Sequence, residues 1–136
     1  MQTMLVERLV REIARWDGVE VAAAAAGSGA VRVSYRGSLL GAVDGAGQAV
    51  LPFPWAVCAV LERQGHAVRT VGRDGAGEVT IGIVGCRDAA LALHLFRLGY
   101  ERAVDRAMLA DRYRIAMGQR PSRGNGSQGT TEERAA

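Results

Sequence analysis

The sequence predicts an α+β fold, with an antiparallel sheet of about five to six strands and helices packed on it, in the order α-β-β-β-β-α-β-β-α. Three observations predict it. Apolar residues recur at helical spacing near both ends of the domain, short runs with strand character lie between them, and glycine-containing turns separate these runs. Short turns between short strands are typical of an antiparallel meander.

Three segments have the apolar periodicity of helices. Residues 3–16 place apolar side chains on one face and arginines and glutamates on the other. Residues 55–64 form a shorter helical pattern, with Pro54 at the first helical position, where a missing N–H costs nothing. The last helix is predicted over 87–118. Its first half is apolar almost all round, which is typical of a buried helix, and its second half is charged.

The strands are predicted from alternation and from their bounding turns. In residues 31–36 valine and tyrosine alternate with arginine and serine, which is the pattern of a half-buried strand. Strands are predicted over 19–24, 31–36, 39–43, 48–51, 67–71 and 78–84. The glycine-rich segments 41–45 and 72–77 are predicted as hairpin turns, because neither lies at a strand-to-helix junction. We expect one domain over 1–118 and a disordered C-terminal tail over 119–136.

The charge pattern argues against nucleic acid as a partner. The formal net charge is +3 and all 17 basic residues are arginine, but they are scattered among 14 acidic residues. Non-specific phosphate binding needs a contiguous basic face, so a solvated surface of mixed charge is favoured. No segment has the roughly 18 consecutive apolar residues of a membrane span, and no apolar signal segment opens the chain. We therefore expect a cytoplasmic protein with no membrane partner, and the oligomeric state stays open.

Neither a metal nor a cofactor is expected from the motifs. Cys58 and Cys86 have no CxxC partner and no histidine at ligand spacing, which argues against a zinc site. The chain has no P-loop, Rossmann fingerprint, GxSxG elbow or HExxH motif. The residues alone therefore carry no signature of known catalytic chemistry.

Three polar residues are the candidates for a catalytic role. His66 lies between a helix-ending glycine and a strand, where an imidazole can act as a general acid or base. Asp44 and Asp74 each lie in a loop beside glycine, where an aspartate usually caps the turn with its own carboxylate. Structural roles are favoured for all three, because a functional role requires that they converge on a pocket.

Three aromatic residues are the candidates for binding a ligand. Phe53 and Trp55 lie where a strand meets a helix, and they either wall an apolar pocket or form a rigid corner. Tyr100 lies in the last helix, where the pattern favours a core residue with its hydroxyl at the rim.

Several segments resemble the luciferase domain family, whose namesake is the fungal luciferase and which includes many small actinobacterial proteins. Leu51-Pro52-Phe53-Pro54 is similar to the family's "DIPFPRPVRDELV", and residues 95–103 are similar to its "LLRLSYERA". Residues 30–37 resemble its "GGVEFRVGGRELGH" strand, and residues 78–83 resemble its "WVSFRI" strand. The segments occur in the family's order, from Trp16 to Ala103.

Two motifs depart from the family. Residues 41–45 stand where the family commonly has the histidines of "GHLHGD", and residues 68–75 stand where it commonly has "HHVLPDSGW". Only Asp44 and Asp74 match polar positions of these motifs. The resemblance implies binding of a small hydroxypyrone or aromatic polyketide-like molecule between sheet and helices, with the aromatic candidates lining the pocket and the polar candidates at its edge. It also implies oxidation by dioxygen without metal or flavin, but the missing imidazoles leave catalysis open.

A second resemblance leads to a different class of function. The order of elements and the final helix with Tyr100-Glu101-Arg102 are similar to the MmcQ/YjbR-like double-wing domains, which implies a non-catalytic DNA-binding or protein-interaction module. The arginine-rich stretch 102–114 would then form the docking face. A structural partner in a complex, with the final helix as the contact, ranks last because its second half is charged.

Overall fold

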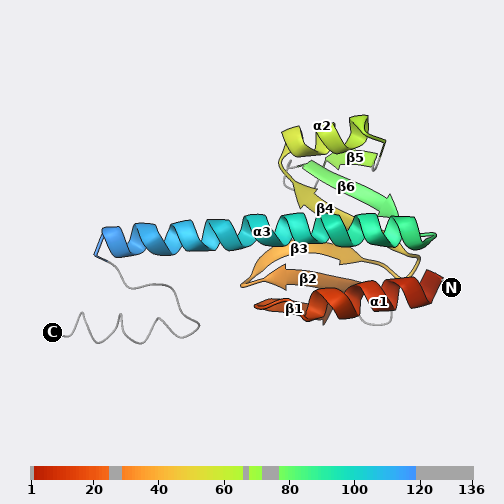
Figure 1. The fold of residues 1–136 in the computed structure, drawn as a ribbon, viewed down its shortest axis with the longest axis horizontal. Coiled ribbons are helices and arrows are strands. Elements are labelled where there is room, and N and C mark those ends of the chain that lie inside the picture. The colour runs from red at the N-terminus through yellow and green to blue at the C-terminus, as the bar shows by residue number, and fades with distance from the viewer. Residues whose placement is uncertain (1, 25–28, 66–67, 72–76, 119–136) are drawn as a thin grey trace. The chain divides into compact units, whose positions relative to one another are not determined.

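Figure 1 shows the computed structural model of the chain, which describes residues 2–24, 29–65, 68–71 and 77–118. Within these residues, three helices and six strands follow one another in the predicted order, so the α+β fold class is confirmed. The elements are α1 (Gln2–Ala14), β1 (Val19–Ala23), β2 (Val31–Tyr35), β3 (Ser38–Val43), β4 (Gln48–Phe53), α2 (Trp55–Arg63), β5 (Val68–Val71), β6 (Gly77–Gly82) and α3 (Cys86–Ala116). Their ends differ from those predicted by no more than two residues, and the predicted tail at 119–136 lies outside the described residues.

The six strands form one antiparallel sheet in the order β1-β2-β3-β4-β6-β5. The first four strands are neighbours both in sequence and in space, so they form the meander that the glycine turns predict. β6 lies between β4 and β5 and pairs with both, after the chain has passed through α2. β1 and β5 are therefore the two edges of this sheet.

The segment with two prolines extends β4 before it starts α2. β4 continues through Pro52 to Phe53, two residues beyond the predicted end. Pro52 is tolerated because β3 pairs with β4 only at residues 49 and 50, so the missing N–H interrupts no ladder on that side. Pro54 is the N-cap of α2, with φ −55° and ψ 146°, and not its first helical residue as predicted. Its carbonyl accepts the N–H groups of Val57 and Cys58.

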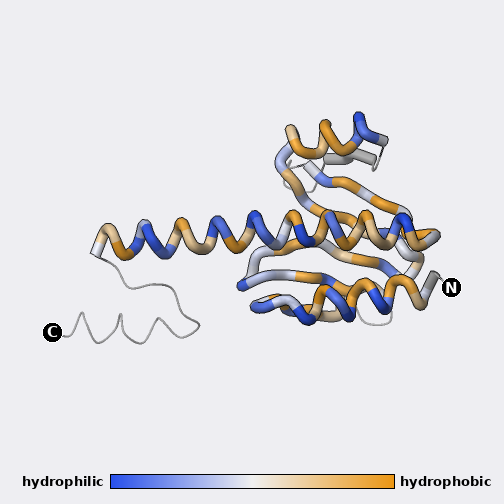
Figure 2. Tube along the Cα trace, viewed as in Figure 1, coloured by the Kyte–Doolittle hydropathy of each residue, from blue (hydrophilic) through white to orange (hydrophobic). Residues whose placement is uncertain are grey.

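One hydrophobic core joins the sheet to the helices. Figure 1 shows α1 and the first part of α3 running side by side over one face of the sheet, while α2 packs on β5 and β6. In β4 and β6 every second residue is buried, which is the period expected for strands with one covered face. Figure 2 shows apolar residues recurring along α1 and the strands. The fully buried large side chains are Phe96, Ile13, Leu51, Ile83, Leu95, Val33, Val43, Val79 and Cys58.

Phe96, the largest fully buried side chain in the part of the chain that the structure describes, lies against Gly41 of β3. The pairing of β2 with β3 shifts register between Val33 and Ser34, so that Leu40 and Gly41 are both buried. A Cβ at Gly41 would come within 2.7 Å of a Phe96 ring carbon and 2.9 Å of the Val50 carbonyl oxygen. Gly41 was predicted both in the strand 39–43 and in the turn 41–45; it lies in β3, where it makes room for the ring.

The chain divides into two compact units, residues 1–103 and residues 104–136. In the second unit, residues 104–116 are helical and carry an ion pair between Arg114 and Asp111 at 2.9 Å. The charged character predicted for this stretch is present, but five large apolar side chains are also at least half exposed. They are Met108, Leu109, Tyr113, Ile115 and Met117, with exposed fractions of 50–66%.

Substitution of Gly41 by alanine is expected to destabilise the fold. The added methyl group must displace either the Phe96 ring or the backbone of β4, so we expect a loss of about 1–3 kcal/mol in the free energy of unfolding. Urea denaturation of Gly41→Ala measures this loss. Gly82→Ala is the matched control, because a Cβ at Gly82 meets nothing within 4 Å. Equal stabilities for the two variants would contradict the role assigned to Gly41.

Candidate binding groove

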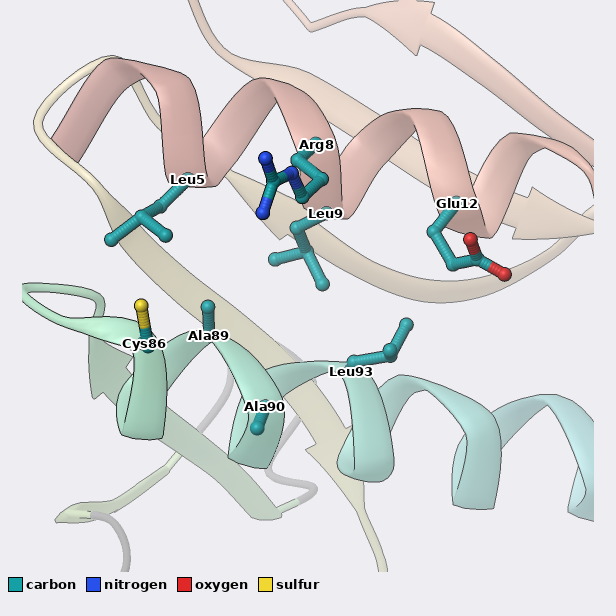
Figure 3. Close-up of a pocket in the computed structure, with 8 residues that line it drawn as sticks. All are labelled: Leu5, Arg8, Leu9, Glu12, Cys86, Ala89, Ala90 and Leu93. Atoms are coloured by element: carbon teal, nitrogen blue, oxygen red, sulfur yellow. The ribbon is translucent and has the colours of Figure 1, made fainter. Parts of the chain in front are cut away.

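A groove lies between α1 and the first two turns of α3, within the unit formed by residues 1–103. Each helix supplies four lining residues at the spacing i, i+3, i+4 and i+7, which places them on one face of that helix. Figure 3 shows Leu5, Leu9 and Glu12 directed toward α3, and Cys86 and Ala89 directed toward α1, along helices that run in the same direction. The lining residues are Leu5, Arg8, Leu9 and Glu12 from α1, and Cys86, Ala89, Ala90 and Leu93 from α3.

The groove exists because small side chains of α3 face larger ones of α1. Ala89 and Ala90 end at their Cβ atoms, so α3 does not fill the space in front of Leu5 and Leu9. Leu9 is 4% exposed, which makes it the closed floor of the groove, while Ala90 is exposed at the opening. The volume is about 250 Å³. A cavity of about 150 Å³ already holds benzene, so this groove has room for a small substituted ring.

The charges at the groove come from α1 alone. Arg8 lies midway along the α1 row, and Glu12 lies one turn further on. The Glu12 carboxylate is within 3.6 Å of the Arg15 guanidinium, on the same helix. Among the described residues, Arg8 has no ion-pair partner. Asp88 of α3 is not among the lining residues, and its carboxylate accepts the N–H groups of Val84 and Gly85 at 3.0 and 3.1 Å.

A free thiol lies at one end of the groove. Cys86 is the first residue of α3, is exposed, and points toward α1 in Figure 3. The other cysteine, Cys58, is fully buried in α2. The two thiols therefore differ in access to solvent. In the part of the chain that the structure describes, no group of three or more metal-binding side chains is present.

The polar residues singled out from the sequence do not line this groove. Asp44 caps the turn between β3 and β4: its carboxylate accepts the N–H groups of Ala46 and Gln48, both at 2.9 Å. Its carboxylate therefore has the structural role that the sequence favoured. His66 and Asp74 lie outside the described residues, so their predicted role stays a prediction.

The three aromatic candidates lie on different parts of the sheet. Phe53 is 4% exposed and belongs to the core. Trp55 is 48% exposed and lies over β6, where a Cβ at Gly77 would be 3.2 Å from its ring. The Tyr100 ring instead contacts Tyr35 of β2. Since β2 and β6 are three strand spacings apart, about 14 Å separates these two places. Their role in ligand binding stays a prediction.

Tyr100 belongs to an aromatic cluster that joins α3 to the end of α1. Its ring centroid lies 5.3 Å from that of Trp16 and 5.4 Å from that of Tyr35, and its hydroxyl donates to the Asp17 carbonyl at 2.8 Å. The Arg97 guanidinium lies 5.1 Å from the Trp16 ring and 5.0 Å from the Tyr100 ring, and it also pairs with Glu101 at 3.3 Å. The cluster fixes the spacing of the two helices that line the groove.

The sequence did not predict the groove, although it contains two signals. Residues 5, 8, 9 and 12 share one helix face, and so do residues 86, 89, 90 and 93. Each row alone is an ordinary helix face. The adjacent alanines at 89 and 90 indicate a gap only once it is known that α1 packs beside them.

Comparison with known proteins gives no assignment, since no family model, curated protein or solved structure matches the chain. Among the described helices, none is both long and apolar enough to cross a membrane.

Removal of the Tyr100 hydroxyl should weaken the junction between α1 and α3. We expect Tyr100→Phe to lose about 0.5–1 kcal/mol of stability in urea denaturation, because the hydrogen bond to the Asp17 carbonyl is lost and the ring is retained. Tyr113→Phe is the control, since Tyr113 is 66% exposed. The assigned bond would be refuted by an unchanged stability for Tyr100→Phe.

The two cysteines should react at different rates. In the folded protein we expect iodoacetamide to alkylate Cys86, while Cys58 reacts on the order of a thousandfold more slowly, because it is reached only on unfolding. Mass spectrometry of the digested protein measures both sites. Cys86→Ser should abolish the rapid labelling, and rapid labelling at Cys58 would contradict its burial.

Proposed function

We propose that this chain is a small-molecule-binding domain of the luciferase-like type that acts in the cytoplasm, and that its ligand is a hydroxypyrone or a related aromatic polyketide-like compound. The groove between α1 and α3 is the proposed binding site. The observation that carries the proposal is this groove, open to solvent and with room for a ring. The exposed free thiol of Cys86 agrees with a reducing compartment.

The lining of the groove suits a flat, mostly apolar molecule. Five of its side chains are aliphatic, and a ring placed between the two helices would lose apolar surface to them. Ligand sites typically combine such a lining with a few polar groups that fix orientation. Here Arg8, Glu12 and Cys86 supply those groups. The volume of about 250 Å³ favours a compact ligand over an extended polyketide.

The choice of ligand class rests on the family resemblance. Phe96 and the residues that follow it to Ala103 form one of the two segments most similar to the luciferase domain family, and they include Arg97 and Tyr100 of the aromatic cluster. The proposal extends to binding and not to oxidation, because the groove contains no imidazole and its carboxylate, Glu12, is already within ion-pair distance of Arg15. Consumption of dioxygen in the presence of a bound compound would extend the proposal from binding to oxidation.

The second candidate is the DNA-binding or protein-interaction module of the double-wing type. The exposed apolar side chains of residues 108–117 favour protein interaction over DNA within this alternative. Asp105 and Asp111 also interrupt the arginines of the same helix, whereas DNA binding favours a contiguous basic surface. Salt-dependent retention on heparin would support the DNA form of this alternative.

Thermal denaturation with a panel of hydroxypyrones and aromatic polyketides tests the proposed function, with double-stranded DNA as the comparison. A compound present at about a hundred times its dissociation constant adds roughly 2.7 kcal/mol, which raises the melting temperature by roughly 10 °C. We expect such a shift for at least one single-ring hydroxypyrone and none for DNA.

Filling the groove should remove this shift. Ala90→Leu adds bulk at the opening, so we expect it to abolish stabilisation by the compound. Ala56→Leu is the matched control, because Ala56 is an exposed position of α2 away from the groove. Stabilisation by DNA alone, or equal shifts for both variants, would count against the groove as the binding site.

A further inference from the structure

The electrostatics of the groove lead to an inference about its ligand, which rests on the proposed function and narrows it. We propose that the groove selects anionic ligands, and that Arg8 is the residue that determines this selectivity. The ligand would be a compact apolar molecule with one negatively charged oxygen, either the enolate of an acidic hydroxypyrone or a carboxylate.

The position of Arg8 is the first argument. It lies in the middle of the α1 row, between Leu5 on one side and Glu12 on the other, and it borders Leu9, the floor of the groove. A ligand whose ring contacts Leu9 therefore places its substituents within reach of the guanidinium. Arginine presents a planar set of donors that suits an oxygen anion, and its charge is permanent at physiological pH.

The neighbouring charges are the second argument. Arg8 has no ion-pair partner among the described residues, so binding a ligand oxygen would break no existing pair. Glu12 is the one acidic side chain of the lining, and Arg15 lies 3.6 Å from it. The α3 side of the groove contributes no charged side chain. Of the two charged lining side chains, Arg8 is therefore the one whose charge no ion pair among the described residues offsets.

The two charged lining residues should act in opposite directions. An anion attracted by Arg8 is also repelled by Glu12, one helical turn away. Removal of the cation should weaken anion binding, and removal of the carboxylate should strengthen it. A neutral ligand of the same shape should respond to neither change. This opposition separates an electrostatic role from a general disturbance of α1.

The test uses two pairs of compounds in which only the charge differs. Triacetic acid lactone is an acidic hydroxypyrone, and its methyl ether is neutral. Phenylacetate and phenylacetamide form the second pair and carry a carboxylate or an amide. Binding to the full chain is measured by calorimetry at low and at high salt, and protection of Cys86 from iodoacetamide reports whether the compound occupies the groove.

In each pair of compounds that binds, we expect the anion to bind more tightly than the neutral compound. Increasing salt should reduce this difference in affinity. Arg8→Gln should weaken binding of the anion by about two- to fivefold, since the Arg8 side chain is exposed and its bond to the ligand is made beside solvent. Arg8→Lys should retain part of the preference because it retains the charge. Glu12→Gln should tighten anion binding by about two- to fivefold.

Arg11→Gln is the matched control, because it removes the same charge from an exposed position of α1 that does not line the groove. An effect of Arg11→Gln equal to that of Arg8→Gln would overturn the inference, since it would show a general charge effect. Equal binding of anion and neutral analogue, with Cys86 protected by both, would overturn the inference and leave the proposed function intact. If no compound binds or protects Cys86, the proposed function fails and the inference fails with it.

Discussion

The contact of Phe96 with Gly41 is the constraint on which the arrangement of this domain depends. Among the described residues, Phe96 is the largest fully buried side chain, and this contact places it against the sheet where the backbone has no side chain. The irregular pairing of β2 with β3 buries Leu40 and Gly41 together, so one strand supplies both an apolar side chain and a space for the ring. Aromatic residues make up only 5% of the chain. The packing of a single large ring therefore contributes strongly to the position of α3 on the sheet.

The groove follows from how α3 is held at this contact and at the aromatic cluster. Phe96 fixes α3 against the sheet, and Tyr100 with Trp16 fixes the end of α1 beside it. Between these contacts and the start of α3, Ala89 and Ala90 are too small to close the space in front of α1. A space therefore remains between the two helices, with the thiol of Cys86 at one end of it.

The residues that attract attention in the sequence and those that form the groove are largely different. Asp44 stands out beside glycine, but its carboxylate is occupied by two backbone N–H groups of its own turn. Tyr100 stands out through the family resemblance, and its hydroxyl bonds a main-chain carbonyl of the segment after α1. Leucine, alanine and a single arginine on helices attract no attention, because each is common on an amphipathic surface. These residues form a groove only because α1 and α3 lie side by side.

The sequence by itself determined the order of elements, because apolar period and glycine turns are local properties that each segment carries alone. It also determined the turn-capping role of Asp44, since that contact spans only four residues. The tertiary structure decided the rest. The sequence allows Gly41 in a strand or in a turn, and only the packing of Phe96, distant in sequence, shows why no side chain fits there. The groove joins residues 5–12 to residues 86–93, and no local pattern specifies that these two helix faces meet. The pairing of the α1 and α3 faces, and the gap between them, result from long-range packing, which depends on the shapes of many side chains at once.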